Sequence, residues 1–179
     1  MGTQMEALEC IMTRRSVRKY SAKSLSEGTL ETLIRAGQQA PSAHNTQPWL
    51  FLSLTERETL HRLVPMTPWW GLLDQCAAAV VVCADERILE EKSMLPEFQT
   101  LSCAAALENM LLAAHSMGLG GVWLGMCRGQ ETYDSFKEVL GIPSWARVIG
   151  MAAFGYPSEM PEPTDRMCSG KWFKERWGE

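Results

Sequence analysis

The residues best able to bind a charged ligand form a short basic run near the start of the chain. Residues 14–20 read Arg-Arg-Ser-Val-Arg-Lys-Tyr, so four cations and a serine hydroxyl fall within six positions. The planar guanidinium of arginine suits bidentate contact with anionic oxygens, and serine adds a short-range donor. The run indicates a phosphate-binding loop, a solvated basic turn or a nucleic-acid contact, and on its own it does not decide among them.

A second candidate is a polar corner held between two prolines. Residues 40–49 read Ala-Pro-Ser-Ala-His-Asn-Thr-Gln-Pro-Trp, after a helical pattern and before an apolar one. Proline cannot continue a helix, and the residue before it is driven toward an extended conformation. The backbone is therefore expected to stay open and to present the hydrogen-bonding side chains of Ser42, His44, Asn45 and Gln47. A polar loop without a ligand has the same composition, so the other motifs must decide.

Two further stretches could line a pocket. Residues 118–126 read Gly-Leu-Gly-Gly-Val-Trp-Leu-Gly-Met, and glycines let another group approach the backbone so that its N–H groups can face a ligand. The stretch contains no GxGxxG, so a Rossmann nucleotide site is not predicted. Trp69 and Trp70 lie in an irregular segment, where paired indoles either wall a site for a flat ligand or belong to the core.

No set of side chains that would itself carry out catalysis stands out. None of the three histidines is spaced with a second histidine or cysteine as metal ligands would be. No Ser-His-Asp, Cys-His or paired-carboxylate arrangement is evident. The six cysteines include no CxxC pair, and most are interpreted as small buried hydrophobic residues in a reducing compartment. We therefore predict no metal site and no catalytic side chain.

The elements that must position these groups alternate between helices and strands. Periodicity predicts helices over residues 5–13, 26–39, 102–117 and 131–140, a short helical pattern at 56–61, and strands at 50–54, 77–84, within 118–126 and at 147–154. Residues 85–101 are polar and are expected to form a loop with helical character. This order predicts an α+β (mixed α/β) fold, with a small central sheet of about four strands flanked by helices.

One predicted helix, residues 102–117, is apolar nearly all round. Such a helix must be covered on all sides, as a central helix or at a dimer interface. Glu108 and Asn109 interrupt its apolar surface, and they would need partners if they were buried.

Length and charge restrict the class of protein. The chain has 179 residues, which suits one domain over residues 1–179, and its net charge of −4 argues against a general nucleic-acid binder. It has no apolar run long enough to span a bilayer and no signal-peptide pattern at its start, so a cytoplasmic protein is expected. Prolines at 157, 161 and 163 precede a basic aromatic end, and this tail is expected to wrap a surface.

Taken in chain order, these motifs resemble the FMN-dependent nitroreductase family. The resemblance covers nearly the whole chain and rests on residues 14–18, 40–49, 109–125, 141–143 and 150–157. The arginine run alone is weak evidence, whereas the ordered set is specific.

The resemblance implies a homodimer with FMN at its interface, and NADH or NADPH as the reductant. The implied cofactor contacts are Arg14, Arg15, Ser16 and Arg18 on the phosphate, ribityl chain and pyrimidine edge; Pro41, Ser42, Ala43, Asn45 and Gln47 from the second subunit; Trp123, Leu124 and Gly125 along the ring near its N5; and Arg166 and Lys171 on the phosphate. Many family members carry an acidic residue at the position of Gly125, so the ring contacts here are expected to be made by backbone.

The chemistry that the resemblance implies is a ping-pong hydride transfer through the flavin. NAD(P)H would reduce the flavin and leave, and a nitroaromatic, a quinone or an activated alkene would then take two electrons in the same place. The alternatives are a flavoenzyme of the same fold with other chemistry (reductive dehalogenation, enone reduction or flavin destruction), a non-catalytic flavin-binding protein, and a nucleic-acid-binding module that uses the basic run.

Overall fold

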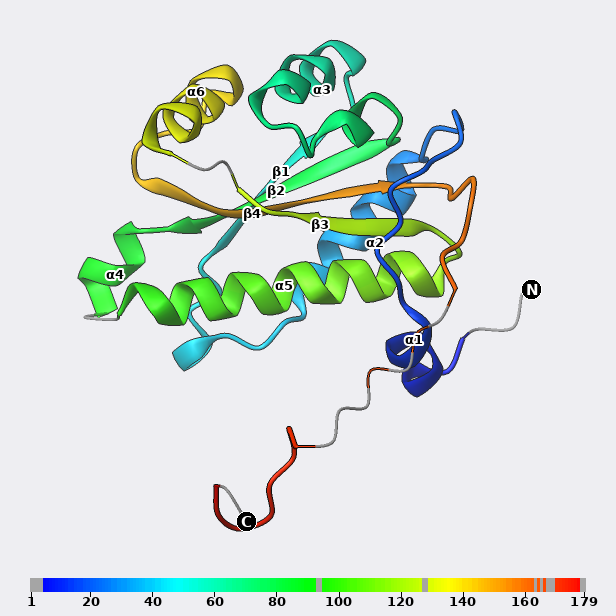
Figure 1. Ribbon diagram of the computed structural model, residues 1–179. Helices are drawn as coiled ribbons and strands as arrows, with labels where there is room; N and C mark the ends of the chain where they lie inside the picture. The colour runs from blue at the N-terminus through cyan, green and yellow to red at the C-terminus, as the bar shows by residue number, and fades with distance from the viewer. Residues whose placement is uncertain are drawn as a thin grey trace.

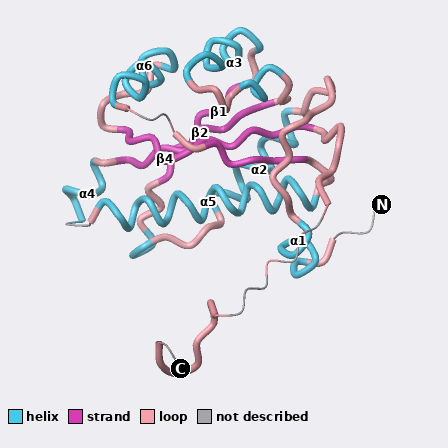
Figure 2. The backbone as a smooth tube through the Cα atoms, viewed as in Figure 1, coloured by secondary structure: helices cyan, strands magenta, loops and turns pink. Residues whose placement is uncertain are grey.

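A four-stranded antiparallel sheet organises the part of the chain that is described, residues 5–92, 95–126, 129–162, 164, 166 and 170–177 of a computed structural model. Its strands are β1 (Trp49–Leu54), β2 (Ala78–Asp85), β3 (Gly120–Leu124) and β4 (Ala146–Gly155). They lie in the order β1-β2-β4-β3, and every neighbouring pair is antiparallel (Figures 1 and 2). The predicted fold class is confirmed, with β3 at one edge.

Strand β2 is buried on both faces, as its continuous apolar run predicts. Val81 contributes to the core on one face of the sheet, whereas Val80 and Val82 contribute to the core on the other. Side chains alternate between the two faces along a strand, so a central strand covered on both sides has no exposed position for a polar residue. Residues 78–84 are accordingly all buried.

Helices cover both faces of this sheet (Figure 1). On one side lie α2 (Glu27–Gln38) and α5 (Pro96–Ser116), and on the other lie α3 (Arg57–Leu63) and α6 (Gln130–Leu140). Shorter elements complete the order: α1 (Ala7–Thr13), α4 (Arg87–Lys92) and the 3₁₀ turns η1 (Ala43–Asn45), η2 (Val64–Met66) and η3 (Gly71–Asp74). No helix in the described part of the chain is both long and apolar enough to cross a membrane.

Helix α5 begins at Pro96, so the prediction of a loop up to residue 101 was wrong for its last six positions. Proline is tolerated in the first turn of a helix, where its missing N–H has no intrahelical partner. The first turns of α5 combine exposed residues with one buried polar residue, Gln99, and this hides the apolar periodicity. Gln99, fully buried, donates from Nε2 to the carbonyl of Asp85 at 2.6 Å.

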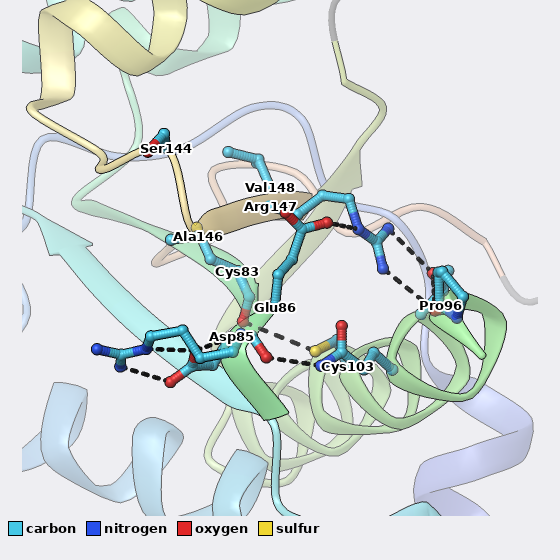
Figure 3. Close-up of polar contacts among 12 residues, drawn as sticks. Cys83, Asp85, Glu86, Pro96, Cys103, Ser144, Ala146, Arg147 and Val148 are labelled. Atoms are coloured by element: carbon cyan, nitrogen blue, oxygen red, sulfur yellow. Dashed lines mark hydrogen bonds and ion pairs between the residues drawn. The ribbon is translucent and has the colours of Figure 1, made fainter. Parts of the chain in front are cut away.

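An arginine on β4 holds the same end of α5 (Figure 3). Arg147 donates from Nη2 to the carbonyl of Pro96 at 3.1 Å and from Nη1 to Oγ1 of Thr100 at 3.2 Å. Its Nε lies 2.9 Å from Oε1 of Glu86, which follows β2. The contacts therefore join α5 to the ends of both central strands.

The two polar residues inside α5 are both partly exposed, and both have partners. Glu108 Oε1 lies 3.2 Å from Nε of Arg14, and Asn109 Nδ2 donates to the carbonyl of Ala36 at 3.1 Å. The ion pair connects α5 to the basic run, and the amide connects it to α2.

The cysteines that are described behave as buried hydrophobic residues. Cys10, Cys76, Cys83 and Cys103 are all buried free thiols. Burial raises the pKa of Cys76 and Cys83 to about 11 and that of Cys103 to about 12, so these thiols stay protonated at neutral pH. Cys127 and Cys168 lie outside the described residues. Within the described ranges, no cluster of three or more potential metal ligands occurs.

Candidate active site

The basic run lies along the free edge of β3. Ser16 forms a parallel bridge with Gly121, and the backbone N–H of Val17 donates to the carbonyl of Gly121 at 3.0 Å. The run is therefore an extended segment held by the sheet.

Two glycines make this approach possible. A Cβ added to Gly120 would lie 2.6 Å from Cγ1 of Val17, which is closer than real Cβ contacts allow. A Cβ added to Gly121 would lie 2.9 Å from Cδ2 of Leu111 on α5. The sequence predicts that other groups come close to the backbone at these glycines. Val17 of the basic run does so at Gly120, and Leu111 of α5 does so at Gly121.

Arg15 is buried and fixes the conformation of the run. Its Nη1 donates to the carbonyls of Met12 and Arg14 at 3.0 and 2.7 Å, and its Nη2 donates to the carbonyl of Thr164 at 3.0 Å. Its Nε is also buried and has no hydrogen-bond partner among the described residues. A buried guanidinium N–H without an acceptor is unfavourable, and an anionic oxygen would satisfy it.

The other two arginines of the run differ in how firmly they are held. The Arg14 side chain is 16% exposed and pairs with Glu108. Arg18 is exposed, and its guanidinium makes one long bond, 3.4 Å from Nη1 to the carbonyl of Ser16. Arg18 is therefore available to a ligand with little loss of protein contacts.

A buried histidine beside the run remains neutral and leaves the local charge to the arginines. Nε2 of His115 lies 2.9 Å from Oγ1 of Thr13. Burial lowers the pKa of His115, and the nearby Arg14 and Arg15 lower it further. The sequence gives no signal for this contact, because His115 occurs within a helix that is otherwise apolar.

A cavity of about 680 Å³ opens beside the end of β3 and brings several predicted site residues together. Arg18 lines it, as do Trp123, Leu124 and Gly125 from β3 and the turn that follows. The opposite wall is the segment 66–70 with Leu72. Both tryptophans of that segment line the cavity, and Trp70 is in addition fully within the core, so both interpretations of the pair apply. Sequence reasoning missed Met66, Thr67 and Leu72.

The backbone of Trp123, which is expected to lie along the cofactor's ring, points toward the open edge of β3. Backbone polar groups of successive residues in an antiparallel strand point to alternate sides. Because the carbonyl of Gly121 points outward to Val17, the N–H and C=O of Trp123 point outward as well. Trp123 can therefore offer backbone hydrogen bonds to a group in the cavity.

The polar corner is strained and lies apart from this cavity. His44, Asn45 and Gln47 all have φ close to +50°, a left-handed conformation that residues other than glycine seldom adopt. The Oγ of Ser42 accepts from the N–H of Gln47 at 3.0 Å and closes a turn, so the expectation that the backbone stays open here was wrong. Figure 1 places η1 on the side of α5 away from the sheet.

The predicted contacts from this corner therefore do not meet the basic run within one chain. They are Pro41, Ser42, Ala43, Asn45 and Gln47, of which Ala43 donates from its N–H to Oγ of Ser102 on α5 at 3.3 Å.

The two predicted cations of the C-terminal segment have different positions. Arg166 comes two residues after Thr164, whose carbonyl accepts a hydrogen bond from Arg15 of the basic run. Lys171 is exposed in the segment 170–177, which Figure 1 shows well away from the sheet and α1. Lys171 is thus not brought to the arginines.

Comparison with known proteins identifies the fold and the family. A family model described as the Nitroreductase family matches residues 11–69 and 66–156. A relative from Archaeoglobus fulgidus, whose name assigns it to the NADH dehydrogenases and NAD(P)H nitroreductases, is 37% identical over 176 residues, which is 96% of this chain and 99% of the relative. A crystal structure of a protein from Parabacteroides distasonis, of the same named class, has a TM-score of 0.86 and 32% identity, covering 96% of this chain and 98% of the other.

A third similar protein was solved with a ligand. It comes from Desulfovibrio desulfuricans, is described as a nitroreductase in complex with FMN, and has a TM-score of 0.79 and 26% identity, covering 97% of this chain and 99% of the other. The expected family and class of enzyme are confirmed by these matches: the chain is an oxidoreductase that belongs to the nitroreductase family.

Proposed function

We propose that this chain is an NAD(P)H-dependent FMN oxidoreductase that reduces flat electrophilic acceptors such as nitroaromatics and quinones. The observation that carries the proposal is the meeting of Arg18 with the backbone of residues 123–125 around one cavity at the edge of β3. The FMN bound by the Desulfovibrio relative supports the choice of cofactor, and the names of the relatives support NADH or NADPH as reductant.

The residues present fit FMN at both of its ends. At the anionic end, Arg14 and Arg15 supply positive charge, and a phosphate oxygen would satisfy the buried Nε of Arg15. At the ring end, the cavity of about 680 Å³ lies within the roughly 300–1,000 Å³ typical of ligand pockets. Its walls are largely apolar, as a flat heteroaromatic ring requires.

Bound FMN would supply the redox chemistry, accepting a hydride from NAD(P)H and passing two electrons to the acceptor in a second half-reaction. The protein's part is binding and electrostatics. Arg18 would stabilise negative charge at the pyrimidine end of the ring, and a backbone N–H near Gly125 would hold the N5 edge. No side chain is assigned as a general acid or base.

The proposed enzyme is a homodimer, because one chain leaves part of the site unused. Apolar side chains on α1 and α5 are exposed, among them Leu8 at 72%, Met12 at 66% and Leu101 at 66%. Burying such side chains against a second copy is favourable. A second subunit would also bring its corner at residues 41–47 to the flavin, and the C-terminal arm would wrap the pair. The proposal treats residues 1–179 as one nitroreductase-like domain of a cytoplasmic enzyme.

Initial rates test the proposed mechanism. With FMN bound, NADH or NADPH varied against several fixed concentrations of a quinone should give parallel double-reciprocal lines, because the two substrates occupy the same cavity in turn. Lines that intersect would show that both are bound together, and would contradict the ping-pong scheme while leaving the cofactor assignment standing.

A further inference from the structure

The two adjacent tryptophans beside the cavity have opposite environments. Trp70 is 1% exposed, and its ring meets Phe136 edge-on, with centroids 5.5 Å apart and planes at 64°. Trp69 lines the same cavity but is 79% exposed. An indole is among the largest apolar groups, so an exposed one that also lines a cavity can become buried against a ligand there.

Two hydrogen bonds to Thr67 fix the backbone around Trp69. The N–H of Trp69 donates to Oγ1 of Thr67 at 3.3 Å, and the N–H of Trp70 donates to the carbonyl of Thr67 at 3.3 Å. Pro68 lies between Thr67 and Trp69, and its ring fixes its own backbone angle φ. With Trp70 anchored against Phe136, the turn presents Trp69 to the cavity in a defined position.

The rest of the cavity indicates which ligand would use this indole. Leu72, Val122 and Leu124 give it an apolar lining, and Arg18 is the charged side chain among its lining residues. A ligand suited to this arrangement is planar and apolar, with an electronegative substituent that can face a guanidinium. A nitro group or a quinone carbonyl on an aromatic ring has these properties.

We propose that Trp69 is a specificity-determining residue that stacks on the planar aromatic electron acceptor. The inference rests on the proposed function, because that function brings the acceptor into this cavity beside the flavin ring. Offset-stacked aromatic pairs are favoured beyond the area they bury, and the loss of one corresponds to a change in binding of about five- to tenfold. Trp70 supports the turn and makes no such contact.

The test compares an aromatic acceptor with one that cannot stack. FMN-loaded W69A, W69F and wild-type enzyme are assayed at saturating NAD(P)H with menadione and with ferricyanide. In W69A fully loaded with FMN, the KM for menadione should rise about five- to tenfold, whereas kcat/KM for ferricyanide should be unchanged. W69F should restore most of the menadione KM. W145A is the control, because Trp145 is also partly exposed, at 37%, and does not line the cavity.

Two results would overturn the assignment: an unchanged menadione KM in W69A, or an equal loss with both acceptors. Failure of the proposed function gives a different result, namely a wild-type enzyme that does not oxidise NAD(P)H with either menadione or ferricyanide as acceptor. Equilibrium dialysis of menadione against wild-type and W69A protein still tests Trp69 in that case. Binding five- to tenfold weaker in W69A supports the stacking role, and equal binding refutes it.

Discussion

Replacing Arg18 by alanine should weaken FMN binding by about ten- to a hundredfold and leave the stability of the fold nearly unchanged. Hydrogen bonds to charged groups contribute about 1.5–3 kcal/mol each, which corresponds to this range. Arg18 is exposed and makes a single long bond to the carbonyl of Ser16, so its removal leaves no buried group without a partner. Titration of the apoprotein with FMN, followed by flavin fluorescence at low and high salt, measures the change.

The neighbouring Lys19 provides the matched control. Its ammonium pairs with Glu159, and it does not line the cavity. Both substitutions remove one positive charge from the same run, so long-range electrostatics changes similarly in each. If K19A weakens FMN binding as much as R18A does, the effect is one of net charge and the direct contact assigned to Arg18 is wrong.

Replacing Gly120 by alanine should reduce stability by about 1–3 kcal/mol and sharply reduce FMN binding as well. The new Cβ would lie 2.6 Å from Cγ1 and 2.7 Å from Cβ of Val17, so one of the two backbones must move. Val17 is buried and hydrogen-bonded to Gly121, and its displacement would carry the flanking arginines with it. Urea unfolding gives the first quantity, and FMN titration of the folded protein gives the second.

Gly28 serves as the control for this substitution. A Cβ there has no heavy atom within 4 Å, so Gly28→Ala in helix α2 is expected to be neutral or stabilising by up to about 1 kcal/mol. The account of β3 would be contradicted if Gly120→Ala behaved like Gly28→Ala, or if it lost stability while the folded fraction kept its full affinity for FMN.

The sequence predicts what depends on local pattern. The three valines of β2 predict a strand buried on both faces, and Ser26, whose side chain accepts from the N–H of Thr29, predicts the start of α2. The start of α5 escapes prediction because Gln99 is a polar residue in a fully buried position, satisfied on one side by the carbonyl of Asp85. Periodicity cannot reveal polar groups that are buried by tertiary contacts.

The site, like the fold, is predictable where it depends on local composition and not where tertiary contacts assemble it. The basic run and residues 123–125 are recognisable from their composition, and Arg18 of the run lines the cavity together with residues 123–125. The wall formed by Met66 and Leu72 is not recognisable, because these are ordinary apolar residues brought there by two 3₁₀ turns. The corner at residues 40–49 is recognisable as polar but not as the left-handed turn that it forms, and within one chain it lies apart from the cavity.

The visible absorption spectrum of the protein reconstituted with FMN tests the central claim most directly. It should be recorded before and after anaerobic addition of NADH or NADPH. The account predicts a spectrum of tightly bound flavin that bleaches on addition of the reduced nucleotide, with the flavin retained by the protein on gel filtration. A protein that takes up no FMN, or whose bound flavin stays oxidised with both nucleotides, would contradict it.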